Sequence, residues 1–255
     1  MYQNVLFYEF TPINNPELFR DEHRIITKAL NLLGKILVSE EGINGNVSGT
    51  KHETKQYMEL LRKRFSDIEF KIGNTKTHTF NKMVVKYRPE IITLEEEVDM
   101  SQRGEYVTPK ELKELLDNNE DVVLLDGRNK YEADFGTFNK AIIPDINTFK
   151  EFPRFIQENL SELKDKQIVT FCTGGIRCEK LTAYMKQQGF ENVKQLQGGI
   201  LTYGEEIGGE HWRGECFVFD ERLAVDMNNI EAVHENRENT ACANPAYFKY
   251  KLQES

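Results

Sequence analysis

The chain has 255 residues, 39% of them hydrophobic and 29% charged, which is typical of a folded globular protein with one large domain or two ordinary ones. No run approaches the roughly 18 consecutive apolar residues of a membrane helix, and "MYQNVLFYEF" lacks the basic start of a secretory signal, so we expect a cytoplasmic protein without membrane contact. The net charge of −9 argues against a nucleic-acid-binding surface over the whole chain, because phosphate binding requires a positive face.

The first predicted elements are a strand over residues 4–10, "NVLFYEF", and a helix over residues 15–30. Asn15 is the expected N-cap of this helix, and Pro16 is its expected first residue. The apolar residues of the segment predict a buried face made of Leu18, Phe19, Ile25, Ile26 and Leu30.

The following segments complete a domain with alternating strands and helices. Residues 34–49, "GKILVSEEGINGNVSG", predict two short strands joined by a tight turn at Asn44-Gly45. A second helix is expected after a Thr50 cap, and two further strands at residues 68–72 and 81–88. The order strand-helix-strand-strand-helix-strand predicts a ferredoxin-like (acylphosphatase-like) α+β domain, a fold that alone implies no function.

Positive charge is concentrated in this first part of the chain. Residues 51–88 contain ten Lys or Arg against four Asp or Glu, whereas residues 101–255 contain 19 against 27. A basic patch for RNA phosphates is therefore possible, although ordinary surface lysines are an equally simple explanation. The candidate RNA-binding residues are Arg62, Lys63, Arg64, Lys82, Lys86 and Arg88.

An acidic stretch with weak periodicity, "PEIITLEEEVDMSQRGEY", predicts a linker and a domain boundary near residue 100. We therefore divide the chain into residues 1–100, residues 101–211 and a C-terminal extension over residues 212–255.

The second part predicts a doubly wound parallel sheet. Thr108, Pro109 and Glu111 form the start of a helix with a capping box. The apolar runs "VVLLDGR", "QIVTF" and "NVKQL" predict buried parallel strands, and a helix over "RCEKLTAYMKQQ" is expected to stop at Gly189. Ligands in such sheets bind beyond the carboxyl ends of the strands.

Cys172 lies at this position, directly after "QIVTF" and before a helix, in "FCTGGIRCEK". The curled loop and the helix N-terminus favour an anion, either the Cys172 thiolate or a bound oxyanion, with Arg177 as a neighbouring cation. Four residues separate Cys172 from Arg177, one fewer than in cysteine phosphatases, so the smaller ring favours sulfur chemistry over phosphate hydrolysis. A small buried hydrophobe at a strand end is the alternative role of Cys172. The intervening residues are Thr173, Gly174, Gly175 and Ile176.

The segments "LLDGRNKYEADFGTFNKAI", "FCTGGIRCEK" and "LQGGI" resemble a rhodanese domain, with Asp126 and Arg128 beside the active loop. Together with "EGINGN" and "GECFVFDERLAVD", they resemble the rhodanese-domain tRNA uridine hydroxylases, from the first strand to about Asp226. The resemblance implies an oxidoreductase that converts the wobble uridine in the tRNA anticodon loop to 5-hydroxyuridine, with molecular oxygen as co-substrate. It also implies that Cys172 and Cys178 act as a pair. We expect no protein partner.

Two other functions remain open. The chain could be a rhodanese-type sulfurtransferase that forms a persulfide on Cys172, or a binding module that keeps only the rhodanese shape. The intact cysteine, glycines and arginine of the loop favour the two enzymes over the binding module. A packed helix residue is the simpler role for Cys178.

Cofactor motifs are not visible in the sequence. The five histidines show no metal-ligand spacing, and no GxGxxG follows a predicted strand, so we expect no metal, flavin or nicotinamide. The tail after "FDER" contains only Cys242, which gives no basis for a zinc site, and Cys216 is expected in the core. Trp212 and Phe217 could stack on a base, although a core position is more typical.

Overall fold

The computed structural model describes residues 1–228, which form two compact units that divide between Thr93 and Leu94. The division falls inside the acidic stretch that predicts the linker. Ile91, near the end of the first unit, is buried, its N–H donates to Glu41 Oε1 at 2.7 Å, and its carbonyl accepts from Asn44 Nδ2 at 2.9 Å. The start of the predicted linker is therefore part of the first unit. Cys242 lies outside the described residues.

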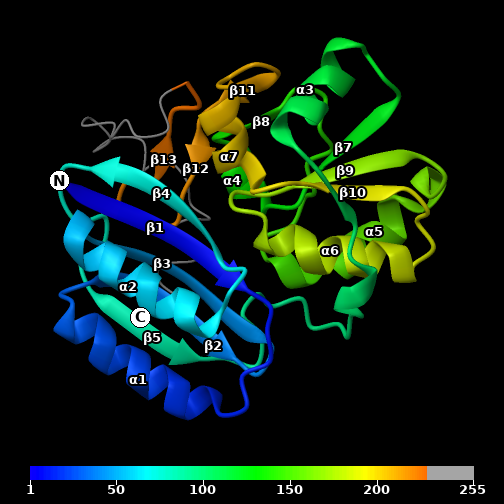
Figure 1. The fold of residues 1–255 in the computed structure, drawn as a ribbon. Helices are drawn as coiled ribbons and strands as arrows, with labels where there is room; N and C mark the ends of the chain where they lie inside the picture. Colours follow the sequence, from blue (N-terminus) through cyan, green and yellow to red (C-terminus); the bar gives the residue numbers. More distant parts are fainter. Residues whose placement is uncertain (229–255) are drawn as a thin grey trace. The chain divides into compact units, whose positions relative to one another are not determined.

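The first unit is one five-stranded sheet in the order β4-β1-β3-β2-β5, with two helices that share its core (Figure 1). Its strands are antiparallel except for β5, which pairs parallel with β2. The elements are β1 (Tyr2–Glu9), α1 (Pro16–Ala29), β2 (Leu33–Ser39), β3 (Gly42–Thr50), α2 (Lys51–Arg64), β4 (Glu69–Thr75) and β5 (Met83–Tyr87). The predicted ferredoxin-like order is confirmed, with β5 as an added edge strand.

The helix starts follow from local hydrogen bonds. The Asn15 side chain accepts from the Leu18 N–H, and Thr50 forms a capping box with Glu53. The predicted buried face of α1 is wrong at Leu18 and Ile25, which are 55% and 71% exposed. These two residues lie seven positions apart and therefore share the solvent face, while His23 and Thr27 point inward.

The turn predicted at Asn44-Gly45 is also wrong. The chain reverses at Glu40-Glu41, and Asn44 and Gly45 lie inside β3, where they pair with Leu37 and Ile36. A side chain at Gly45 would collide with the ring of Phe7, since an ideal Cβ there lies 2.3 Å from that ring. The glycine therefore serves close packing within the sheet rather than a turn.

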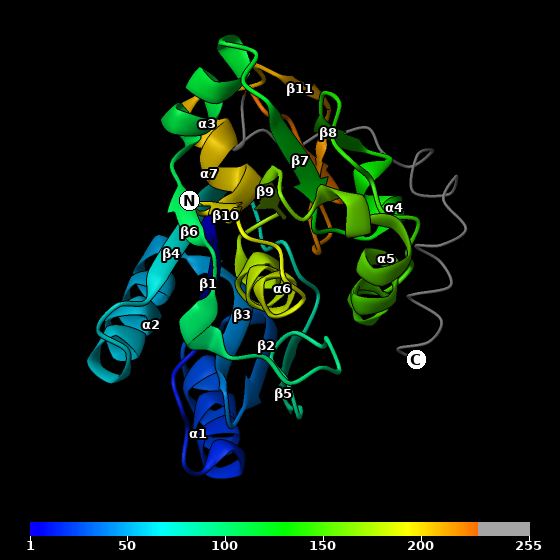
Figure 2. The ribbon, with the colours of Figure 1, turned by 90° about the vertical axis from the view of Figure 1, so that its right-hand side faces the viewer.

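The second unit is a four-stranded parallel sheet in the order β6-β10-β9-β7 with helices wound around it (Figure 2). Thr108 and Glu111 form the expected capping box, and the predicted doubly wound sheet is confirmed. Its elements are η1 (Met100–Gln102), β6 (Glu105–Val107), α3 (Pro109–Asp117), β7 (Val122–Asp126), α4 (Lys130–Ala133), β8 (Gly136–Phe138), η2 (Phe149–Glu151), α5 (Phe152–Asn159), η3 (Ser161–Leu163), β9 (Gln167–Phe171), α6 (Ile176–Gln187), β10 (Val193–Leu196) and α7 (Gly199–Glu206).

The described part of the C-terminal extension belongs to this unit. Strand β11 (Trp212–Gly214) pairs antiparallel with β8, and β12 (Cys216–Phe217) forms a hairpin with β13 (Ala224–Val225). Trp212, Cys216 and Val225 lie in the same core cluster as strand β9. Among residues 1–228, no helix has the length and apolarity to cross a membrane.

Candidate active site

Cys172 follows strand β9 directly, and its loop ends where α6 begins. Gly175 adopts a positive φ of 103°, which a residue with a Cβ rarely adopts, and this turns its N–H toward the Cys172 sulfur at 3.2 Å. The backbone N–H groups of Arg177 and Cys178 also donate to that sulfur. The loop is therefore a cradle in which the Cys172 sulfur itself takes the position of the anion.

The cradle changes the acidity of Cys172. Burial raises the pKa of this thiol, but a hydrogen bond from the Cys178 thiol, the charge of Arg177 and the backbone N–H groups outweigh it and lower the pKa to about 6. Burial and the adjacent Cys172 sulfur raise the pKa of Cys178 well above its usual range. Near neutral pH, Cys172 is therefore the thiolate of the pair, and the Cys178 thiol donates a hydrogen bond to it.

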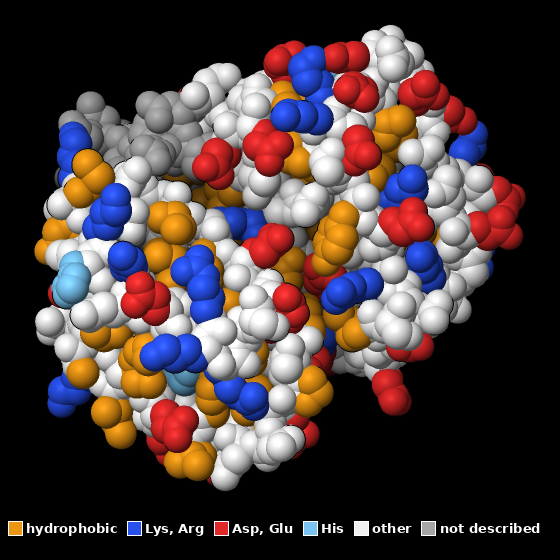
Figure 3. Space-filling model, viewed as in Figure 1, with side chains coloured by type: hydrophobic (Ala, Val, Ile, Leu, Met, Phe, Trp, Pro, Cys, Tyr) orange, Lys and Arg blue, Asp and Glu red, His pale blue; other side chains and the backbone are white. Residues whose placement is uncertain are grey.

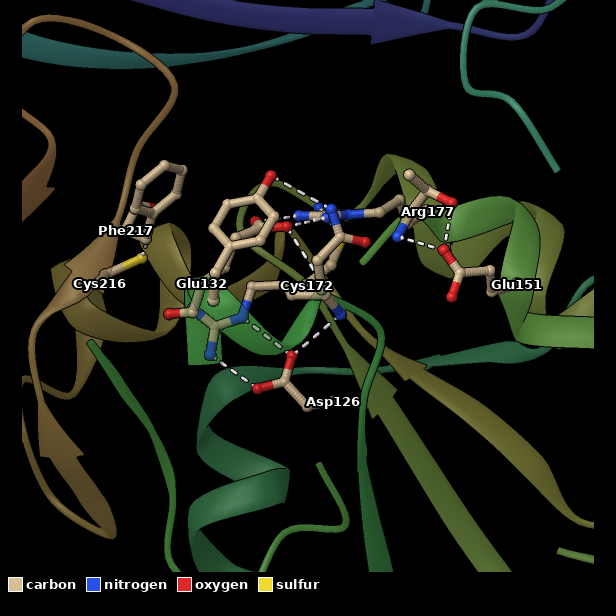
Figure 4. Close-up of polar contacts among 12 residues, drawn as sticks. Asp126, Glu132, Glu151, Cys172, Arg177, Cys216 and Phe217 are labelled. Carbon is tan, nitrogen blue, oxygen red and sulfur yellow. Dashed lines mark hydrogen bonds and ion pairs between the residues drawn. The ribbon is translucent and has the colours of Figure 1, made fainter. Parts of the chain in front are cut away.

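Arg177 is held by Glu132, which α4 supplies (Figure 4). The two terminal nitrogens of Arg177 lie 2.6 and 2.8 Å from the two carboxylate oxygens of Glu132, and both side chains are buried. Such a bidentate pair fixes the guanidinium in one orientation. Removal of one partner from a buried pair destabilises a fold by about 3–5 kcal/mol.

Asp126 and Arg128 form a second buried ion pair, at the end of β7. Arg128 donates to Asp126 at 2.9 and 2.7 Å and to the Gly136 carbonyl at 2.6 Å, and Thr137 donates to Asp126 at 2.8 Å. The Arg128 Nη1 also reaches the Glu132 carbonyl at 3.4 Å. These contacts fix α4, and with it the carboxylate that holds Arg177.

The N-terminus of α7 packs against the backbone of the Cys172 loop. Gly198 and Gly199 have φ values of 70° and 69°, and the Ile200 N–H donates to the Cys172 carbonyl at 2.9 Å. An ideal Cβ on Gly199 would lie 2.4 Å from that carbonyl oxygen and 2.8 Å from the Gly175 nitrogen. The "LQGGI" segment thus allows two backbones to approach closely at the active loop.

Two buried polar atoms near the loop have no hydrogen-bond partner among the described residues: Thr173 Oγ1 and Asn129 Oδ1. A buried polar group without a partner costs about 1–3 kcal/mol. Thr173 directly follows Cys172, and Asn129 directly precedes the helix that carries Glu132. Both atoms are inaccessible to solvent in this structure.

The C-terminal extension brings a third thiol and an aromatic cluster to this region (Figure 4). Cys216 is buried, as expected for a core residue, and burial raises its pKa to about 12. Trp212 and Phe217 are buried as well, which excludes the suggestion that they stack on a base. Arg128 lies under the Trp212 ring at 5.4 Å, and Phe217 packs against Tyr131 at 5.6 Å.

The candidate RNA-binding residues all lie exposed on the first unit. Figure 3 shows Lys and Arg side chains interspersed with acidic and hydrophobic ones over this unit. Arg62, Lys63 and Arg64 form the end of α2, where Arg62 stacks on Phe70 at 4.9 Å. Lys86 lines a cleft of about 670 Å³ between α1 and β5. The other cleft residues with positive charge or a titratable ring are Arg24, Lys28 and His78.

Sequence reasoning did not identify Glu132, Arg24 or Lys28 as functional candidates. Glu132 lies 45 positions before Arg177, and its only local signal is the capping position three residues after Asn129. Within residues 1–228, no three His, Cys, Asp or Glu side chains are grouped as metal ligands.

Comparison with known proteins assigns both units. Residues 2–91 match the UPF0176 acylphosphatase like domain, and residues 108–206 match the Rhodanese-like domain. A Staphylococcus saprophyticus protein called tRNA uridine(34) hydroxylase is 48% identical over 237 residues, which cover 90% of this chain and 75% of the relative. A Bacillus licheniformis protein of the same name is 47% identical over 239 residues, 91% of this chain and 74% of the relative. A solved rhodanese-like domain protein from Staphylococcus aureus is 27% identical with a TM-score of 0.34, over 40% of this chain and 94% of that one.

Proposed function

This chain belongs to the family of tRNA uridine(34) hydroxylases, and on that basis we propose that it converts the wobble uridine of tRNA to 5-hydroxyuridine with Cys172 as its reactive group. The observation that carries the role of Cys172 is its cradle, which lowers the pKa of the thiol to about 6. The thiolate is the reactive form of cysteine, and the electropositive loop favours it at Cys172 although the residue is buried.

Molecular oxygen is the co-substrate in this proposal, and the two thiols supply the electrons. Uridine, O₂ and two thiols balance to 5-hydroxyuridine, water and one disulfide. One oxygen atom enters the C5–H bond of uracil, and the other leaves as water with the two thiol protons. The two electrons required come from formation of the Cys172–Cys178 S–S bond, and an external thiol reduces this bond before the next turnover.

The exposed basic residues of the first unit fit phosphate contacts to the tRNA. Such contacts position a nucleic acid without reading its sequence, so base recognition is left to the second unit. The bases of a single-stranded anticodon loop can turn outward toward a protein. A base in a duplex must first be unpaired and unstacked, which costs free energy.

The test is a single-turnover reaction of purified, reduced protein with tRNA under ¹⁸O₂, followed by nucleoside mass spectrometry. We expect ¹⁸O in 5-hydroxyuridine and one Cys172–Cys178 disulfide per product. Cys172→Ser and Cys178→Ser should each lower the single-turnover rate by roughly 10⁴- to 10⁶-fold, the range found when one member of a catalytic group is removed. Label from water would exclude O₂ as the oxygen source, and full activity of Cys172→Ser would exclude the cysteine role.

A sulfurtransferase reaction is the alternative, favoured by the four-residue loop. Turnover of thiosulfate with cyanide, together with unchanged tRNA, would support it over hydroxylation. Cys216→Ser is the matched control in both assays, because this thiol is buried and has a pKa raised to about 12.

A further inference from the structure

Glu132 is a fully buried carboxylate whose hydrogen bonds join helix α4 to the active loop (Figure 4). Its Oε2 accepts from the Asn129 N–H at 3.1 Å and from Arg177 Nη1 at 2.6 Å, and its Oε1 accepts from Arg177 Nη2 at 2.8 Å. A buried charge is costly without a partner, so the carboxylate and the guanidinium hold each other in place. Glu132 therefore fixes where the positive charge of Arg177 lies.

The position of Glu132 is itself fixed by tertiary contacts. Helix α4 has only one turn, and so short a helix is not stable by itself. The Lys130 N–H donates to the Ile146 carbonyl at 3.0 Å, and the Tyr131 ring packs edge to face on the buried Phe217 ring, with centroids 5.6 Å apart. These contacts hold the turn that presents the Glu132 carboxylate to the loop.

Glu132 has two opposite effects on the Cys172 thiolate. Its negative charge disfavours a second anion nearby, whereas its hold on Arg177 keeps a positive charge beside the sulfur. The other titratable or charged groups around this pair come from the end of β7, the Cys172 loop and elements α4, α6 and β12: Asp126, Arg128, Tyr131, Cys172, Cys178 and Cys216. The stronger of the two effects determines the sign of the change when Glu132 is replaced.

We propose that Glu132 is a positioning residue of the reaction: it keeps the Arg177 guanidinium beside the Cys172 sulfur, and this hold outweighs the repulsion between its own charge and the thiolate. The inference rests on the proposed function, in which that thiolate is the reactive group. A bidentate carboxylate suits this role because it fixes both the place and the plane of a guanidinium. Without the carboxylate, Arg177 would be a buried charge that gains by turning toward water.

The test is the titration of the Cys172 thiolate in two Glu132 variants, followed by its ultraviolet absorbance. Glu132→Gln removes the charge and replaces one acceptor oxygen by an amide NH₂, which cannot accept from Arg177. Glu132→Asp keeps the charge but withdraws it by one methylene, and it decides the question if the glutamine variant does not fold. Both variants should raise the midpoint above the wild-type value of about 6, by roughly one to three pH units, the effect of one nearby charge.

Hydroxylation of tRNA should also become slower in both variants, by about 10²-fold, the scale of a misplacement of about 1 Å in a catalytic site. Glu111→Gln is the matched control. Glu111 is the capping carboxylate of α3, as Glu132 is of α4, but it is exposed and bonds to Thr108. The midpoint and the rate of this control should equal those of wild type.

Two results would overturn the inference. A lower midpoint in Glu132→Gln would show that the carboxylate acts as a counter-charge and not as a positioning group. An unchanged midpoint in folded variants that are less resistant to chemical denaturation would leave Glu132 with a purely structural role.

The titration requires no tRNA, so it separates this inference from the proposed function. If wild type does not hydroxylate tRNA but both variants raise the midpoint, the proposed function is wrong and the positioning of Arg177 stands. If wild type hydroxylates tRNA and the midpoint does not rise in the variants, only the inference is wrong.

Discussion

Three buried thiols in the second unit differ in acidity because their neighbours differ. Cys172, Cys178 and Cys216 are all buried and none is in a disulfide. Burial raises the pKa of each thiol, to about 12 for Cys216 and well above the usual range for Cys178. Of these three thiols, only Cys172 receives three backbone N–H groups and a thiol donor, and only its pKa falls, to about 6. At Cys172, the hydrogen bonds to the thiolate and the charge of Arg177 lower the pKa by more than desolvation raises it.

We predict that the Cys172 thiolate appears with a midpoint near pH 6. A thiol with a lowered pKa loses its proton as pH rises through that value, so the thiolate fraction increases from pH 5 to pH 7. The measurement is thiolate absorbance near 240 nm, taken as the difference between wild type and Cys172→Ala. Cys178→Ala should move the midpoint upward, because it removes a donor to the anion, whereas Cys216→Ala should leave it in place. A midpoint near 8.5 in wild type would contradict the cradle.

The sequence predicted part of this site and not the rest. Cys172 and Arg177 stand in one short loop after an apolar run, so their proximity follows from local chain geometry. The contact between Arg177 and Glu132 joins β9–α6 to a short helix after β7, and only the parallel pairing of these strands brings the two together.

At the scale of elements, caps and buried strands were predicted well because their signals are local. Thr50, Thr108 and the run "QIVTF" each lead to the expected element. The turn at Asn44-Gly45 failed because strand pairing outweighed a local turn preference: Gly45 pairs with Phe7 across β1 and β3 and leaves room for its ring. Gly45 therefore marks a place of close packing against Phe7 rather than a turn.

The close approach of α7 to the active loop gives a prediction for Gly199. Gly199→Ala should destabilise the fold by about 2–4 kcal/mol and impair catalysis. Alanine would be strained at the left-handed φ of this position, and its Cβ would clash with the Cys172 carbonyl oxygen. Gly189→Ala is the matched control. Gly189 also has a positive φ, of 86°, but its nearest neighbour is the flexible Lys164 end at 3.7 Å. Chemical denaturation of both variants checks the difference, and equal losses would show that the close approach is unimportant.

For the whole molecule, the charge is distributed unevenly between the two units. The first unit carries the positive segment, whereas the second unit carries the reactive loop and most of the acidic excess. The uneven distribution of charge is already visible in the composition of the sequence. The sequence did not predict the cleft in which Lys86 joins Arg24 and Lys28, since that depends on β5 pairing with β2 beside α1.

We predict that tRNA binding depends on salt through the first unit. Lys82→Gln with Lys86→Gln should lower the slope of log affinity against log salt by about 0.7–0.9 for each tRNA phosphate that these lysines neutralise in the wild type. The matched control is Lys110→Gln with Lys140→Gln, which removes two exposed lysines from the second unit. Fluorescence anisotropy over a salt series measures the slopes. Equal slopes for the two double variants would mean that Lys82 and Lys86 do not bind the tRNA backbone.

The burial of Cys172, which is 1% exposed, also determines which oxidants reach it. A thiolate with so low a pKa is ordinarily prone to irreversible conversion into sulfinic and sulfonic acids when peroxide is present. Here the sulfur faces inward into its own loop, and the Cys178 thiol stands beside it to condense with any sulfenic acid. The same packing that lowers the pKa of Cys172 is therefore expected to protect it from irreversible oxidation. Oxidation of Cys172 should stop at a Cys172–Cys178 disulfide, which cellular thiols can reduce.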